Sequence, residues 1–120
     1  MPASRFEARV RRAPGVAVVD LIGDIDAGAD EALNEAYTSA ATDDHAVLLN
    51  FADVGYINST GIALIVGVLA SARKEQRPIT ACGLADHYRE IFEITRLSDF
   101  MQIFADERSA VDGVTLGTGR

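Results

Sequence analysis

Ser59 and Thr60 carry the side chains best suited to chemistry, because each offers a hydroxyl where an apolar helix is predicted to begin. They stand in the sequence Asn58-Ser59-Thr60-Gly61. A hydroxyl in such a position can serve as a nucleophile, accept a phosphate or cap a helix. A nucleophile needs a general base and an orienting group, and Ser59 does not stand in a nucleophile-elbow sequence. No base is evident, so no catalytic residue is predicted and an enzyme is the least favoured class.

The remaining titratable residues predict neither a metal site nor a cofactor. Asp24, Asp26 and Glu35 have the outline of a calcium loop. However, Gly28 stands where such a loop needs a ligand and Ala29 stands where it needs a glycine for its turn. His45 and His87 lie far apart, and a single cysteine cannot complete a structural zinc site. The glycines do not have the spacing of a Walker or dinucleotide-binding sequence.

The composition favours one folded domain in the cytoplasm. The chain has 120 residues, of which 48% are apolar and 24% charged, as in soluble globular proteins. Its 18 acidic and 11 basic residues give a net charge of −7 without a basic stripe, so nucleic acid is not an expected partner. A lone cysteine fits a reducing compartment. The apolar run from Ile62 to Ala70 is about half the length that a membrane-spanning helix needs, so no membrane partner is expected either.

Hydrophobic patterning predicts alternating strands and helices. In the first half of the chain we expect a hairpin strand at Phe6–Val10, a turn at Ala13–Gly15, a strand at Val16–Ile25, a helix at Ala27–Ala41 and a buried strand at Ala46–Phe51. In the second half we expect a loop containing Gly55, a helix at Ile62–Lys74 with its caps in Asn58–Gly61, a strand at Ile79–Cys82, a helix at Asp86–Ile94, an edge strand at Phe100–Phe104 and a short helix at Asp106–Val111.

This order predicts an α/β fold with a mixed sheet of four to five strands packed with about four helices. The domain is expected to span residues 1–112. Residues 113–120, which are rich in glycine and threonine, are expected to form a flexible tail.

Four segments together resemble the STAS-domain anti-sigma-factor antagonists. In that family an aromatic and an apolar residue precede Asp-Ser-Ser-Gly or Asp-Ser-Thr-Gly, and an apolar helix follows, which is similar to Val54–Ile62. Leu21–Asp26 resembles the family's second-strand ending, Leu-x-Gly-Glu-Leu-Asp. Val47–Phe51 is similar to its central strand and Ile91–Leu97 to its third helix. The resemblance covers nearly the whole chain.

The resemblance implies a regulator that controls a sigma factor by partner switching. Its partners would be an anti-sigma serine/threonine kinase, bound when the chain is unphosphorylated and released on phosphorylation at Ser59, and a metal-dependent serine/threonine phosphatase that restores binding. Thr60 is the weaker candidate for the phosphate. One departure is Asn58, which replaces the usual aspartate and removes a carboxylate next to the acceptor hydroxyl. The expected partner-binding residues are Asp26, Asn58, Ser59, Thr60, Gly61 and Ile62.

Several alternatives remain open from the sequence. Ser59 and Thr60 can be ordinary helix-capping residues, and Asp24 and Asp26 can form a polar turn between a strand and a helix. The apolar helix after Gly61 can be entirely core or can expose a patch to a partner. A scaffold subunit of a signalling or transport assembly, never phosphorylated, is the alternative function, and Asn58 is its best support.

Overall fold

The computed structural model describes residues 5–42 and 46–117. The strands are β1 (Glu7–Ala13), β2 (Val16–Ile25), β3 (Ala46–Ile57), β4 (Ile79–Cys82) and β5 (Gln102–Phe104). The helices are α1 (Asp30–Ala40), α2 (Ser59–Lys74), α3 (Asp86–Ile94) and α4 (Glu107–Gly117), with 3-10 turns η1 (Ala27–Ala29) and η2 (Leu97–Asp99).

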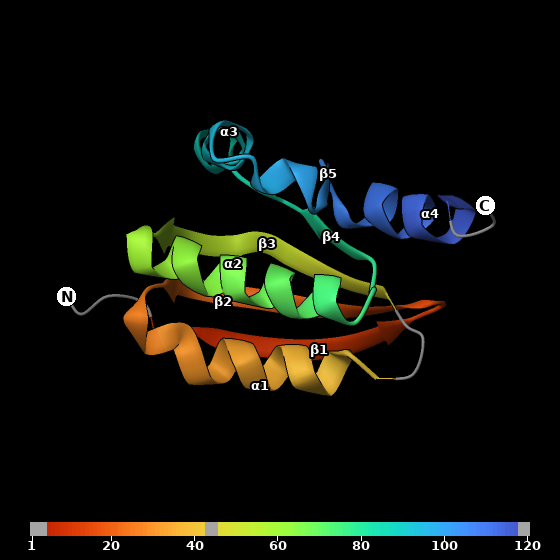
Figure 1. Ribbon diagram of the computed structural model, residues 1–120, viewed down its shortest axis with the longest axis horizontal. Coiled ribbons are helices and arrows are strands. Elements are labelled where there is room, and N and C mark those ends of the chain that lie inside the picture. Colours follow the sequence, from red (N-terminus) through yellow and green to blue (C-terminus); the bar gives the residue numbers. More distant parts are fainter. Residues whose placement is uncertain (1–4, 43–45, 118–120) are drawn as a thin grey trace.

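The strands form one mixed sheet in the order β1-β2-β3-β4-β5 (Figure 1). β1 and β2 are antiparallel, and every later neighbouring pair is parallel. The hairpin closes where Ala13 pairs with Val16, and Gly15 has a φ of +75°, the left-handed value that suits a glycine in the second central position of a type II turn. The predicted α/β class with a mixed sheet is confirmed.

Helices cover both faces of the sheet, which explains the continuous apolar runs in β2 and β3. Ala17 and Val19 face the larger core, to which α1, α2 and α3 contribute. Val16 and Val18 alternate with them and face a smaller core beneath α4. α1, α2 and α3 therefore form one layer on the face of the larger core, and α2 lies over the centre of the sheet (Figure 1).

β3 is longer than the sequence predicts. The prediction ended it at Phe51 and placed a loop around Gly55, but the strand continues to Ile57. Its second half pairs in parallel with the end of β2, from Ile22 opposite Asp53 to Ile25 opposite Ile57, with two register shifts. Pairing with β2 thus overrides the weak strand propensity of this polar, glycine-containing stretch.

α4 is also longer than predicted. The sequence-based prediction ended this helix at Val111 and began the tail at residue 113, whereas the helix runs to Gly117. Val114 is buried one turn after Ala110 in the smaller core. A β-carbon on Gly113 would lie 2.5 Å from the Phe104 ring, so the glycine lets α4 pack closely against β5. Residues 118–120 of the predicted tail lie outside the described residues.

A charged network joins α4 to the sheet. Arg11 on β1 donates to Asp20 on β2 at 2.5 and 2.9 Å and to Glu107 at 2.7 and 3.1 Å. Asn50 on β3 donates to the same Asp20 carboxylate at 2.8 Å. The hydrogen bonds from Arg11, assisted by the one from Asn50, hold the pKa of Asp20 below its ordinary value.

Replacing the Asp20 carboxylate should make the free energy of unfolding depend less on pH. Because the folded-state pKa of Asp20 is depressed, its contribution is present above its unfolded pKa of about 3.9 and is lost as the pH falls through the folded value. We expect Asp20→Asn to lower the free energy of unfolding by about 1 kcal/mol at pH 7, since Arg11 is half exposed. Urea titrations at pH 7 and pH 3 should show the difference from wild type narrowing in acid. An equal difference between wild type and Asp20→Asn at the two pH values would contradict the lowered pKa of Asp20.

Candidate functional site

Asn58 is the residue that begins α2. It is extended, with φ −92° and ψ −177°, and its side-chain oxygen accepts a hydrogen bond from the backbone of Gly61 at 2.8 Å. Of the several side chains in Asn58–Gly61 that could cap the helix, that of Asn58 is therefore the one that does so. The asparagine performs this structural task as well as an aspartate would, so the departure at this position does not disturb the turn.

Ser59 and Thr60 occupy the first turn of α2 and are both exposed. Neither hydroxyl makes a hydrogen bond within residues 5–42 and 46–117. Capping thus accounts for Asn58 but not for the two hydroxyls that follow it. At this end of a helix the free backbone N–H groups favour a negative charge, so a phosphate on either hydroxyl would be compatible with the fold.

The turn that contains Asp26 lies beside the turn that contains Asn58. Ile25 and Ile57, the residues before them, are paired across β2 and β3, and the backbone N–H of Asn58 donates to the carbonyl of Ile25 at 3.2 Å. The half-buried Asp26 accepts from the backbone of Gly28 at 2.9 Å and begins η1, which packs against α2. The polar-turn interpretation of Asp26 therefore holds structurally, and this turn packs beside the start of α2.

Gly61 and Ile62 anchor the start of α2 to the sheet. A β-carbon on Gly61 would lie 2.0 Å from the carbonyl oxygen of Ile25, a contact no side chain can make. Ile62 is half-buried against the larger core. Both were predicted as partner-binding residues; the structure gives each a packing role, and Gly61 itself is buried.

Tyr88 on α3 supports the same turn, a contact that sequence reasoning missed. Its hydroxyl accepts a hydrogen bond from the backbone N–H of Ile57 at 3.0 Å. β4 ends opposite Asn50, so beyond that point no strand among the described residues pairs with this side of β3. The spacing of Tyr88, Ile91 and Phe92 in the sequence indicates only that they share one side of a helix. A signal for the role of Tyr88 would have been its hydroxyl, since a tyrosine hydroxyl usually finds a hydrogen-bond partner when it is buried.

The site brings together an exposed hydroxyl, a helix N-terminus and the neighbouring turn that contains Asp26. Such an arrangement can carry a phosphate and present it to a partner. In the part of the chain that the structure describes, no group of three histidine, cysteine or acidic side chains could hold a metal ion. Among the same residues, no helix has the length and hydrophobicity to cross a bilayer.

Comparison with known proteins agrees with this geometry. The STAS domain family matches residues 7–110. The anti-sigma-B factor antagonist of Listeria monocytogenes is 35% identical over 82 residues, which are 68% of this chain and 72% of the relative. The corresponding antagonist of Staphylococcus epidermidis is 34% identical over 59 residues, 49% of this chain and 55% of the relative.

Solved structures share the fold. An anti-sigma factor antagonist from Mycobacterium paratuberculosis superposes with a TM-score of 0.78 at 21% identity, over 92% of this chain and 94% of that one. The phosphorylated form of the Bacillus cell fate determinant SpoIIAA gives a TM-score of 0.68 at 20% identity, over 89% of this chain and 98% of that one. The family match, the Listeria relative and the fold agree, and the chain belongs to the STAS-domain anti-sigma-factor antagonists.

Proposed function

We propose that this protein is a cytoplasmic partner switch without enzymatic activity of its own. When Ser59 is unphosphorylated, the Asp26 and Asn58 turns and the start of α2 bind an anti-sigma serine/threonine kinase, which frees a sigma factor. Phosphorylation of Ser59 by that kinase ends binding. A metal-dependent serine/threonine phosphatase removes the phosphate, so ATP and metal belong to the partners.

The exposed Ser59 hydroxyl on the first turn of α2, free of any hydrogen bond to the described residues, is the observation that carries this proposal. A kinase must reach the acceptor oxygen, and this hydroxyl is available without unfolding the turn. The cap is supplied by Asn58, so modifying Ser59 does not remove the hydrogen bond that begins the helix.

The physical basis of the switch is the charge that a phosphate adds. At neutral pH this is about −1.5 to −2 charges, which a helix N-terminus tolerates in water. Within a close interface the same charge must be stripped of water near the Asp26 carboxylate, and that is costly. Modification can therefore end binding without changing the fold.

The relatives support this proposal by what their names state. The Listeria and Staphylococcus proteins are antagonists of an anti-sigma factor, and the Bacillus structural relative has been solved in unphosphorylated and phosphorylated forms. We infer that an anti-sigma factor is the partner of the present chain as well, and that phosphorylation is its control.

Phosphate mapping tests the assignment of Ser59. Incubation with candidate anti-sigma kinases and ATP should add one phosphate, which mass spectrometry should place on Ser59. We expect Ser59→Ala to lose the modification and Thr60→Ala to keep it. Ser59→Ala should also bind the kinase constitutively and fold normally, because Asn58 retains the cap. Full labelling of Ser59→Ala would show that Ser59 is the wrong residue.

A scaffold that is never phosphorylated is the second candidate function. Asn58 favours it, since the chain has an asparagine where the resemblance expects an aspartate. A chain that binds an assembly but accepts no phosphate from any kinase would support it. An esterase activity of wild type well above that of Ser59→Ala would instead favour an enzyme.

A further inference from the structure

One exposed stripe runs the length of α2. Ser59, Ala63, Val66, Ala70 and Arg73 follow one another at intervals of four and three residues, which places them on one side of a helix, and all five are exposed. The stripe is about 21 Å long at a rise of 1.5 Å per residue. It leads from the Ser59 hydroxyl to the opposite end of the helix.

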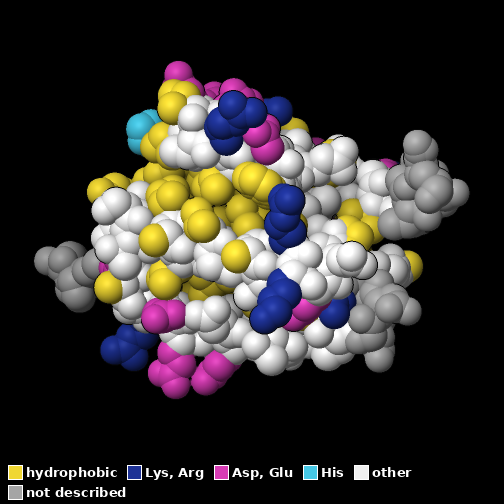
Figure 2. Space-filling view, in the orientation of Figure 1, with side chains coloured by type: hydrophobic (Ala, Val, Ile, Leu, Met, Phe, Trp, Pro, Cys, Tyr) yellow, Lys and Arg dark blue, Asp and Glu magenta, His cyan; other side chains and the backbone are white. Residues whose placement is uncertain are grey.

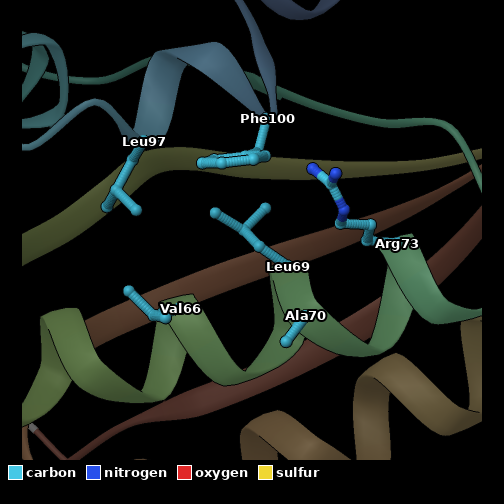
Figure 3. A pocket seen from close by; sticks show the side chains of 6 residues that line it. All are labelled: Val66, Leu69, Ala70, Arg73, Leu97 and Phe100. Atoms are coloured by element: carbon cyan, nitrogen blue, oxygen red, sulfur yellow. The ribbon is translucent and has the colours of Figure 1, made fainter.

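The far end of this stripe opens into a pocket of about 200 Å³ between α2 and η2. Val66, Leu69, Ala70 and Arg73 line it from α2, and Leu97 and Phe100 line it from the η2 segment (Figure 3). Val66 is 43% exposed and Phe100 is 51% exposed, although both are large and apolar. Figure 2 shows apolar side chains gathered on this side of the molecule. A cavity of about 150 Å³ accommodates benzene, so the pocket has room for one leucine or phenylalanine side chain.

Arg73 gives the pocket a charge. Its guanidinium lies 5.2 Å from the centre of the Phe100 ring, and it forms no ion pair with a carboxylate of the described residues. A protein that covers the pocket would remove water from this cation, and a buried cation without a partner is costly. The covering surface must therefore supply an acidic group next to its apolar side chain.

We propose that the kinase surface which contacts Ser59, in the function proposed above, continues along the α2 stripe and ends in this pocket. There an apolar side chain of the kinase lies between Leu69 and Phe100, and an adjacent carboxylate pairs with Arg73. A standard interface buries about 800 Å² on each partner, which is broad enough to include both Ser59 and a pocket about 21 Å away. The pocket then adds affinity that Ser59 phosphorylation does not touch directly.

Titration of the kinase that labels Ser59 tests this surface. Isothermal titrations with ADP in place of ATP prevent phosphate transfer during the measurement. We expect Arg73→Glu and Phe100→Ala each to weaken binding about fivefold. Arg73 is exposed in the last turn of α2, where the helix dipole favours a cation. Arg73→Glu should therefore lose only a little thermal stability, as Lys74→Glu does, even if Phe100→Ala proves less stable. Raising the salt concentration should reduce the loss caused by Arg73→Glu.

Lys74→Glu is the matched control, since it makes the same charge reversal one residue later, away from the pocket lining. Wild-type affinity of Arg73→Glu and Phe100→Ala, or an equal loss in Lys74→Glu, would overturn the pocket contact. Sedimentation gives a further test. If wild type is a dimer and Arg73→Glu is a monomer, a second copy of the chain occupies the pocket, and the contact with the kinase is overturned. Measuring Ser59→Asp in the same series distinguishes the two proposals. If Ser59→Asp binds the kinase like wild type, the proposed function fails. If only Arg73→Glu and Phe100→Ala bind like wild type, the pocket contact alone is removed.

Discussion

Ser59→Asp should weaken binding of the anti-sigma kinase at least about tenfold, equivalent to about 1.4 kcal/mol, while leaving the fold intact. At the first turn of α2 the new carboxylate should be neutral or stabilising by about 0.3–1 kcal/mol, because the helix dipole favours it. Asn58 keeps the cap in this variant. Thermal unfolding should therefore be close to that of wild type, and a loss of affinity would report the interface alone.

The size of the effect follows from desolvation. The turn of Asp26 lies beside the start of α2, since Ile25 pairs with Ile57 and η1 packs against the helix. A second carboxylate enclosed there with the kinase would be buried without a partner, at a cost of several kcal/mol if water were fully excluded. Aspartate carries less charge than a phosphate and fewer acceptor oxygens, so phosphorylated protein should bind more weakly still.

Ser71→Asp provides the control for this measurement. Ser71 is exposed on the same helix, twelve residues after Ser59 and off the α2 stripe. The Ser71→Asp variant therefore adds the same carboxylate away from Asp26, and isothermal titration with the kinase should give wild-type affinity. Equal affinity of Ser59→Asp and wild type would remove the Ser59 turn from the interface and leave the scaffold as the better account.

The central elements of the fold could be predicted because their patterns are local. The strand at Val16–Ile25 and the helix at Asp86–Ile94 appear with the predicted bounds. The end of β3 could not be predicted, since residues 53–57 become a strand only through pairing with β2. Gly113 misled the prediction for a similar reason: the glycine serves contact with Phe104, a residue on another element.

The candidate site was visible in the sequence to the extent that it lies in one continuous segment. Ser59 and Thr60 could be picked out from their own order as hydroxyls at the start of a helix. Their role, and the other partner-binding residues including Asp26, were expected only through the family resemblance. The hydrogen bond from Ile57 to Tyr88 joins residues that no local pattern connects. The pocket could not be foreseen either, because Phe100 was assigned to an edge strand, whereas it ends the η2 turn and stacks on Arg73 of α2.

Gly61→Ala should lower the free energy of unfolding by about 2–4 kcal/mol, although the same change within a helix usually stabilises it by about 1 kcal/mol. The reversed sign has a steric cause. The added β-carbon would lie 2.0 Å from the carbonyl oxygen of Ile25 and 3.0 Å from a methyl group of Ile57. Backbone cannot give way as a flexible side chain does, so α2 must move away from β2 and carry Ser59 away from the turn of Asp26.

Gly67→Ala is the matched control, because it makes the identical change on the same helix where a β-carbon would meet nothing within 4 Å. Only helix propensity should act at that position, and the free energy of unfolding should rise by about 0.5–1 kcal/mol. Urea unfolding of the two variants should therefore move in opposite directions from wild type. A stabilised Gly61→Ala would mean that α2 does not begin in close contact with Ile25, and the shared position of the Asp26 and Ser59 turns would lose its structural basis.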